Sequence, residues 1–178
     1  MIWKLARAEF HANMAVISPG WWNLKHDSYQ TAFPIPTLMK ILYTTQATAT
    51  GGREGSAKTA DGVLDVVLST PKEIGGMGGP GTNPEQLFAC GYSACFLGAL
   101  KFVAGKAKVH IPADATVTGK VSFGPRDDEQ GFGIEVELTI SVPGMDHASV
   151  SQLVDQAHIV CPYSHATRGN IPVTLTVA

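Results

Sequence analysis

The segment from Thr82 to Lys106 constrains the fold more than any other part of this chain. Within it, the 15 residues from Gln86 to Leu100 include no charged side chain. A helix that is apolar on nearly every face belongs in a core, and a membrane-spanning helix needs about 20 apolar residues. The segment therefore predicts a central helix buried in a soluble domain, with an uncharged run too short to cross a bilayer.

The start of this helix is marked by residues with capping chemistry. Thr82 or Asn83 can cap it, and Pro84 suits the first helical position. Glu85 follows Thr82 by three residues, as in a capping box. We therefore expect the helix to begin at about Pro84.

One stripe of this helix carries a cysteine. Spacings of 4, 3, 4, 3 and 4 place six residues on one face, namely Pro84, Phe88, Gly91, Cys95, Gly98 and Phe102. The two glycines allow another backbone to come close. A thiol on such a face is either a small core hydrophobe or a reactive centre in an apolar pocket.

Composition narrows the class of protein. A chain of 178 residues is long enough for one domain with a substantial core. Only 16% of the residues are charged and the net charge is -2, so a nucleic-acid partner is not expected. Three cysteines do not make a secreted disulfide scaffold, and the odd count suits a reducing compartment. We therefore expect a cytoplasmic protein.

Residues 1–38 differ from the rest of the chain. They contain all three tryptophans and lack both an amphipathic period and the continuous apolar stretch of a signal peptide. We predict a poorly ordered or loosely docked extension over residues 1–38 and one domain over residues 39–178.

Alternating apolar and polar residues predict the strands of this domain. Residues 116–123 and 134–142 alternate most clearly, and the polar, glycine-bounded loop between them predicts an antiparallel hairpin. Further strands are expected at 41–50, after Gly55, at 63–69 and at 171–177, and Asp146 can cap a second helix. This pattern indicates an α+β fold in which curved antiparallel sheets pack on the buried central helix.

A glycine-rich loop precedes the central helix. Residues 75–84 contain five glycines and two prolines, so their backbone can approach a ligand closely or move as a lid. The loop lacks the Lys-Ser/Thr ending of a phosphate-binding loop.

Cys161 is the second thiol on a predicted core face. It lies on the apolar stripe of the second helix, so it can meet Cys95 if the two stripes meet. Cys90 cannot bond to Cys95 within a regular helix, because five residues span about 7.5 Å and a disulfide needs Cα atoms within about 6.8 Å. Ordinary core packing remains the alternative for both thiols.

A buried thiol stays inert unless a cation reaches it, because desolvation raises its pKa. Arg53 can supply this cation and Glu85 can hold its guanidinium; alternatively, Arg53 is a solvated turn residue and Glu85 only a capping residue. Glu85 precedes Cys95 by ten residues, about 15 Å along a straight helix. Arg53 must therefore bridge this distance, or the helix must bend near Gly91.

The histidines allow two other chemistries. His158, Cys161 and His165 have the spacing of metal ligands, but Pro162 interrupts their helix and no fourth ligand is evident. A hydrolase with Cys95 as nucleophile and either histidine as base is also open, although the sequence indicates no orienting group and no oxyanion donor.

Three segments of the chain match one family. ATATGGREG (47–55), NPEQLFACGYSACFLGALKFVA (83–104) and VCPYS (160–164) resemble the organic hydroperoxide resistance proteins, a branch of the osmotically inducible protein C-like superfamily. The resemblance covers about residues 39–178, the length of a typical member. Residues 1–38 have no counterpart, and Cys90 stands where the family usually has a small residue.

The resemblance assigns roles to four residues. It implies that Cys95 is the peroxidatic cysteine, Cys161 the resolving cysteine, Arg53 the holder of the thiolate and Glu85 the partner of this arginine. It also implies an intertwined homodimer that reduces organic hydroperoxides to alcohols and is recycled by a dithiol, in this family a lipoylated protein. Neither a cofactor nor a metal is expected.

Apolar residues predict the class of substrate. A pocket for an alkyl chain can be lined by Leu87, Phe88, Phe96 and Met77, with Ile74 and Phe132. Burial of an alkyl chain contributes about 25 cal/mol per Å², which hydrogen peroxide does not gain. Alkyl and fatty-acid hydroperoxides are therefore the expected substrates.

Two other classes of function remain open. A redox-sensing binding protein would use the same cysteines, although the sequence has no basic helix that could read DNA. A purely structural protein would use both thiols only for packing.

Overall fold

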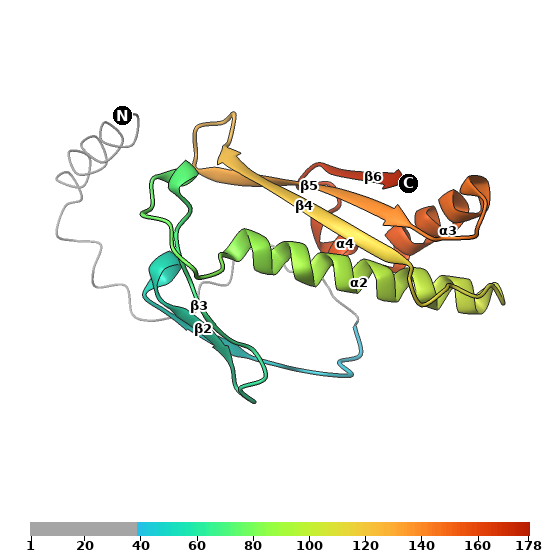
Figure 1. Cartoon of the computed structure of the whole chain (residues 1–178), viewed down its shortest axis with the longest axis horizontal. Coiled ribbons are helices and arrows are strands. Elements are labelled where there is room, and N and C mark those ends of the chain that lie inside the picture. The colour runs from blue at the N-terminus through green and yellow to red at the C-terminus, as the bar shows by residue number, and fades with distance from the viewer. Residues whose placement is uncertain (1–38) are drawn as a thin grey trace.

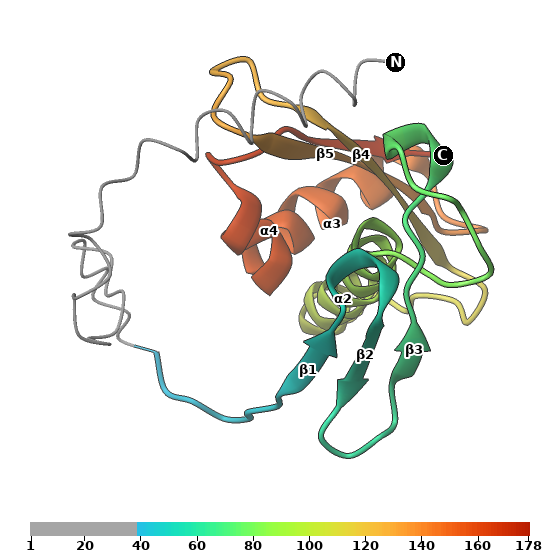
Figure 2. The ribbon, with the colours of Figure 1, turned by 90° about the vertical axis from the view of Figure 1, so that its left-hand side faces the viewer.

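The computed structural model describes residues 39–178, so the predicted extension over residues 1–38 lies outside the described residues. Two three-stranded sheets and a long helix, α2 (Pro84–Lys106), form the framework. Figure 1 shows α2 running along the sheet of β4, β5 and β6. Seen nearly along the axis of α2, the other sheet projects away from the opposite side of this helix (Figure 2).

Helix α2 begins where the sequence predicts, but with a different cap. The side chain of Asn83 accepts a hydrogen bond from the backbone N–H of Gln86, and Pro84 occupies the first turn. The capping box does not form, because Thr82 bonds the side chain of Gln86 and Glu85 pairs with an arginine outside the helix.

Only one side of α2 is buried within the chain. Its inner face packs against β4, α3 and α4 through six buried residues, namely Tyr92, Phe96, Ala99, Leu100, Val103 and Ala104. Gly98 has no atom near the position of a Cβ, and Phe102 is 54% exposed. The predicted stripe is therefore packed around Cys95 and open at its C-terminal end.

The length of α2 also exceeds the uncharged run. Of the residues described, its 23-residue span is long and apolar enough to cross a membrane by length and composition, a test that the core helix of a soluble protein also passes. The uncharged run is still 15 residues long, but the helix continues beyond it on both sides, so the expectation about the run does not extend to the whole of α2. Its buried side belongs to the core of the domain.

The larger sheet covers the inner face of α2. Strands β4 (Thr116–Pro125) and β5 (Phe132–Ser141) form the predicted antiparallel hairpin, with Val121 opposite Val136. The side chains of Val136, Leu138 and Ile140 are at most 1% exposed, so every second residue in the C-terminal half of β5 enters the core.

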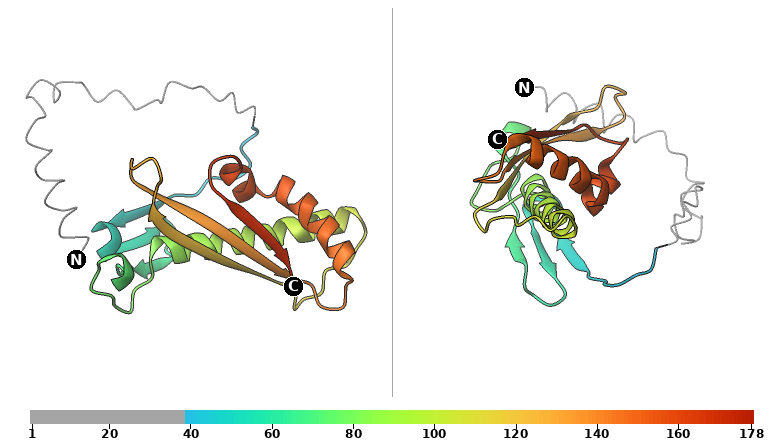
Figure 3. Two further views of the ribbon diagram at one scale, coloured as in Figure 1. Left: turned by 90° about the horizontal axis from the view of Figure 1, so that it is seen from above. Right: turned by 90° about the vertical axis from the view of Figure 1, so that its right-hand side faces the viewer.

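The last strand corrects the expectation of purely antiparallel sheets. Strand β6 (Val173–Val177) pairs with β5 in parallel, with Leu138 opposite Leu175. Two helices, α3 (His147–Val160) and α4 (Pro162–Thr167), connect these strands and return the chain to its starting end. A crossover of this kind makes neighbouring strands parallel, and Figure 3 shows α3 lying beside α2 on its way back.

The smaller sheet is antiparallel and largely exposed. It consists of β1 (Ala47–Thr50), β2 (Ser56–Thr59) and β3 (Asp65–Val67). The strand expected at 41–50 is shorter than predicted, because residues 41–46 form no regular structure and are exposed. Short 3-10 turns follow β1 at Gly52–Glu54 (η3) and β3 at Lys72–Ile74 (η4).

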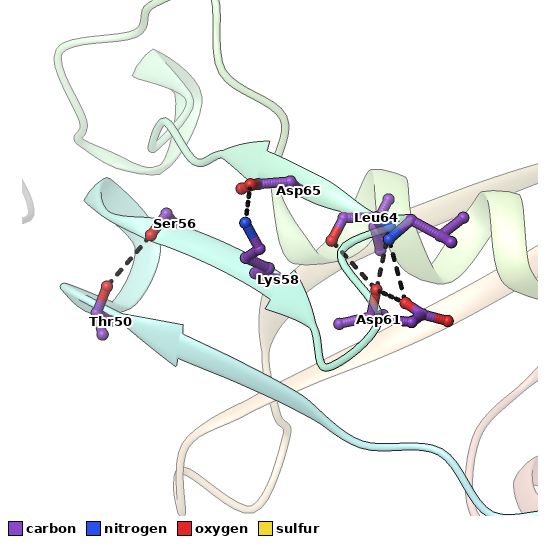
Figure 4. Close-up of polar contacts among 8 residues, drawn as sticks. Thr50, Ser56, Lys58, Asp61, Leu64 and Asp65 are labelled. Atoms are coloured by element: carbon purple, nitrogen blue, oxygen red, sulfur yellow. Dashed lines mark hydrogen bonds and ion pairs between the residues drawn. The ribbon is translucent and has the colours of Figure 1, made fainter.

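Polar contacts on the surface tie these three short strands together. Lys58 pairs with Asp65 across β2 and β3 at 2.6 Å, and Thr50 bonds Ser56 at 3.2 Å (Figure 4). Asp61 accepts a hydrogen bond from Thr59 in the turn between β2 and β3. Exposed contacts of this kind contribute little stability. Because the three strands are also largely exposed, burial adds little to the stability of this sheet within a single chain.

Candidate active site

Cys95 and Cys161 lie in contact, as the two predicted stripes require. The Cys161 thiol donates to the Cys95 sulfur at a Sγ–Sγ distance of 3.5 Å. Cys161 is fully buried, whereas Cys95 is half-buried. Cys161 has an extended backbone between α3 and α4, and Pro162 starts the next helix there. This break turns the Cys161 side chain toward α2.

An aromatic cluster lies beside the two thiols. The ring centroids of Phe88, Tyr92 and Tyr163 lie 5.7 to 5.9 Å apart. The tip of Tyr163 lies over Gly91, where a Cβ would be 3.0 Å from the phenolic oxygen. Gly91 therefore accommodates a side chain from α4, and not a second backbone as predicted. Sequence reasoning missed Tyr163 as a site residue, although it is only two positions after Cys161.

Burial raises the pKa of the Cys95 thiol. The contact with Cys161 raises this pKa as well, and the backbone amide of Tyr163 lowers it. Among residues 39–178, no cation acts in the same direction as this amide. Within one chain, Cys95 is therefore held mainly as a thiol.

Arg53 and Glu85 form the second element of the site. Two hydrogen bonds of 2.9 and 2.5 Å join the Arg53 guanidinium to both carboxylate oxygens. The pairing lowers the pKa of Glu85 and raises that of Arg53, chiefly through these hydrogen bonds. The guanidinium also lies 5.0 Å from the ring centroid of Phe123 on β4, a contact that the sequence did not indicate.

The two pairs do not meet within one chain. Glu85 belongs to the first turn of α2, and Cys95 follows ten residues later, about 15 Å along the axis. Among the described residues, no hydrogen bond joins Arg53 to Cys95. The structure brings together Cys95 with Cys161, and Arg53 with Glu85, but not all four residues.

A pocket of about 330 Å³ opens beside Glu85. Its walls include Pro71, Ile74, Val121 and Phe123, which give it an apolar lining next to the ion pair. None of Leu87, Phe88, Phe96 and Met77 lines it. Phe96 is fully buried in the core, Phe88 joins the aromatic cluster, Leu87 is half-buried, and Met77 is 86% exposed.

A second, larger pocket of about 700 Å³ lies at the tip of the β4–β5 hairpin. Phe132 lines it and stacks on Phe123 with ring centroids 5.0 Å apart. Ile74 and Phe132, which were predicted to share one substrate pocket, therefore line two different pockets.

Comparison with known proteins identifies the family. The family model described as OsmC-like protein matches residues 76–176. An organic hydroperoxide resistance protein of Xanthomonas axonopodis pv. citri is 60% identical over 139 residues, which are 78% of this chain and 96% of that protein. The chain belongs to the organic hydroperoxide resistance proteins of the OsmC-like family.

Solved structures of organic hydroperoxide resistance proteins share this fold. One from Elizabethkingia anophelis is 51% identical with a TM-score of 0.74, covering 79% of this chain and 99% of that chain. OhrB of Bacillus subtilis is 43% identical with a TM-score of 0.71, covering 78% and 100%. The α+β architecture with two small sheets around a central helix is thus the OsmC-like fold. Its family associates the chain with organic hydroperoxide resistance and oxidative stress.

The surroundings of His158 and His165 bear on the metal site and on the cysteine hydrolase that the sequence left open. Among residues 39–178, no group of three or more His, Cys, Asp and Glu side chains is arranged to hold a metal ion. Burial and the charge of Arg168 lower the pKa of His158, whose Nδ1 is buried without a partner in the described part of the chain. Neither His158 nor His165 is hydrogen-bonded to Cys95 there.

Proposed function

We propose that this protein is a thiol-dependent peroxidase that reduces organic hydroperoxides to alcohols. The observation that carries the proposal is the 3.5 Å contact between the Cys95 and Cys161 sulfurs in a member of this family. Two thiols at this distance can alternate between a dithiol and a disulfide with a shift of about 1.5 Å. If both cysteines served only to pack the core, the buried Cys161 sulfur would not need to face the more accessible Cys95 sulfur.

The proposed reaction has two chemical steps. The Cys95 thiolate attacks the outer oxygen of the hydroperoxide, the O–O bond breaks, and the alkoxide takes up a proton and leaves as the alcohol. Cys95 is thereby oxidised to a sulfenic acid. The Cys161 sulfur then attacks the Cys95 sulfur, water leaves, and a disulfide forms that protects Cys95 from further oxidation.

We further propose that the protein works as a homodimer built on the open face of α2. This face carries Cys90, Ala94, Gly98 and Phe102 at intervals of four residues, all of them exposed in the single chain. The smaller sheet adds Val67, 66% exposed, and the turn before β3 adds Val63, 87% exposed. Exposed apolar residues gathered on a protein surface are typical of interfaces.

A dimer also supplies the cation that Cys95 lacks. The Arg53–Glu85 pair lies about 15 Å from Cys95 along its own helix, and burial raises the pKa of this thiol. We infer that Arg53 of one copy stabilises the Cys95 thiolate of the other. A nearby cation lowers a pKa by about 1–3 units, so Arg53→Ala should slow peroxide reduction at pH 7 by about tenfold or more.

The proposed substrates are alkyl and fatty-acid hydroperoxides. The apolar walls of the pocket beside Glu85 support this class, because they stabilise an alkyl chain and offer nothing comparable to hydrogen peroxide. The preference is measured as kcat/KM for tert-butyl or lipid hydroperoxides against hydrogen peroxide. Equal values would contradict it.

A dithiol is the proposed reductant, and a lipoylated protein is the form that the family resemblance indicates. Thiol–disulfide exchange with such a dithiol returns both cysteines to the reduced state and requires no bound cofactor. Three free cysteines support a location in the reducing cytoplasm. Cell fractionation and recycling assays with lipoylated proteins test these two points.

Stopped-flow oxidation of the reduced protein tests the peroxidase proposal. With one equivalent of organic hydroperoxide, wild type should lose two thiols per chain and Cys95→Ser should lose none. Cys161→Ser should stop at the sulfenic acid and proceed to sulfinic acid when a second equivalent is added. Equal, slow consumption of peroxide by all three proteins would overturn the proposal, because both cysteines would then be ordinary core thiols.

A further inference from the structure

A buried network of hydroxyl groups fastens α4 to α2 close to the two thiols. The phenolic oxygen of Tyr92 lies 2.9 Å from Ser164 Oγ and 3.2 Å from Thr167 Oγ1. Tyr92 and Ser164 are fully buried, and Thr167 is 6% exposed. The ring of Tyr92 is packed in an apolar core where phenylalanine would fit equally well, so its hydroxyl serves these two bonds.

Helix α4 depends on such contacts for its position. It has only six residues, and helices this short are not stable alone. It begins directly after Cys161, whose carbonyl accepts from the backbone N–H of His165 at 2.9 Å. The backbone N–H of Cys161 also donates to the carbonyl of Ala157 in α3. The position of α4 on α2 therefore contributes, together with α3, to where the Cys161 sulfur lies.

The position of Cys161 matters for the second step of the proposed reaction. A sulfenic acid on Cys95 has two fates, namely attack by the Cys161 thiol with loss of water or oxidation by a second hydroperoxide to sulfinic acid. The sulfurs start 3.5 Å apart and must approach to about 2.05 Å. A small displacement of α4 would therefore favour overoxidation. The attack of Cys95 on the first peroxide should change less, because α4 acts on that step only through the backbone amide of Tyr163 and the contact with Cys161.

We propose that Tyr92 is a positioning residue for disulfide formation: through Ser164 and Thr167 its hydroxyl keeps α4, and with it Cys161, within reach of oxidised Cys95. This role rests on the peroxidase function proposed above. It acts chiefly on the resolving step, which separates it from Arg53 and Glu85, whose charges act on the first step.

Tyr92→Phe tests the role, because it removes one oxygen and keeps the ring. Reduced protein is mixed with tert-butyl hydroperoxide, and two rates are followed, sulfenic acid formation by a dimedone-type trap and disulfide formation by thiol loss. We expect a first rate that changes much less than the second, a disulfide rate about tenfold lower, and a larger sulfinic acid fraction by mass spectrometry at excess peroxide. Tyr43→Phe makes the same chemical change at a residue that is 79% exposed and should leave both rates unchanged.

A second variant separates positioning from a general loss of stability. Ser164→Ala removes the other end of the shorter bond, so it should give a split of the same kind between the two rates, and the double variant should be no slower than Tyr92→Phe alone. Unchanged disulfide rates in folded Tyr92→Phe and Ser164→Ala, or equal loss of both rates, would overturn the role of Tyr92. If wild type itself loses no thiols, the peroxidase proposal fails instead.

Discussion

At the scale of single residues, burial and charge act on different parts of the site. Burial raises the pKa of Cys95, whereas the ion pair with Arg53 lowers the pKa of Glu85. A thiol needs a nearby cation to ionise at neutral pH. Cys95 and Glu85, which holds Arg53, lie at opposite ends of the N-terminal half of α2.

The Arg53–Glu85 pair predicts a specific acid sensitivity. Because the folded pKa of Glu85 is depressed, its contribution to stability is present above the unfolded value of about 4.3 and is lost as the pH falls through the folded value. Urea unfolding at pH 6 and pH 3 should therefore show a larger loss of stability for wild type than for Glu85→Gln. Glu73→Gln, at an exposed glutamate of η4, should behave as wild type. Equal losses in all three proteins would show that the pair contributes nothing to folding.

At the scale of elements, the hairpin of β4 and β5 forms the wall against which α2 packs. Leu138 on β5 is fully buried between this strand and the helices. Its neighbour Thr139 points the other way and is exposed. Adjacent residues of one strand thus have opposite roles.

This alternation predicts the effect of truncating the core. Leu138→Ala should lower the free energy of unfolding by about 2–5 kcal/mol, because it removes buried methyl groups and leaves a cavity. Thr139→Ala should change it by less than about 1 kcal/mol. Denaturant unfolding measures both, and similar values for the two variants would contradict the register of β5.

The open face of α2 gives the second prediction at this scale. A Cβ at Gly98 meets no atom within 4 Å, so Gly98→Ala and Gly98→Leu should fold and should gain helix propensity within one chain. If a second copy packs there, the dissociation constant of the dimer should rise from Gly to Ala to Leu. Analytical ultracentrifugation measures this order, and a Leu variant that dimerises like wild type would move the interface elsewhere.

At the scale of the whole molecule, the single chain leaves apolar surface uncovered on α2 and on the smaller sheet. Within the described part of the chain, no cation lowers the pKa of Cys95. If two copies pack face to face, the apolar surface is covered. The Arg53–Glu85 pair of one copy can then lie beside the Cys95 thiol of the other.

Mixing two inactive variants tests this arrangement. Arg53→Ala retains Cys95, and Cys95→Ser retains Arg53, so a mixed dimer contains one complete site. After random subunit exchange, half of the dimers are mixed, and peroxidase activity should recover to about a quarter of the wild-type value. Unmixed variants subjected to the same exchange are the control. No recovery in a verified mixed dimer would place both residues of a site in one chain.

Much of the fold could be predicted from the sequence, because capping residues and hydrophobic periods act over a few positions. Pro84 marks the start of α2, the β4–β5 hairpin follows from alternation, and Cys95 and Cys161 lie on faces that can meet. The family motifs also indicated the pairing of Arg53 with Glu85. These features need little knowledge of distant parts of the chain.

Only the tertiary structure decided the rest, because contacts between distant segments depend on how whole elements pack. It made β6 parallel to β5, left the outer face of α2 open, and separated Arg53 from Cys95 within one chain. It also joined Tyr92 to Ser164, residues 72 positions apart that no local period connects. The sequence by itself determined which helices, strands and reactive side chains this protein has, whereas long-range packing determined which of them meet.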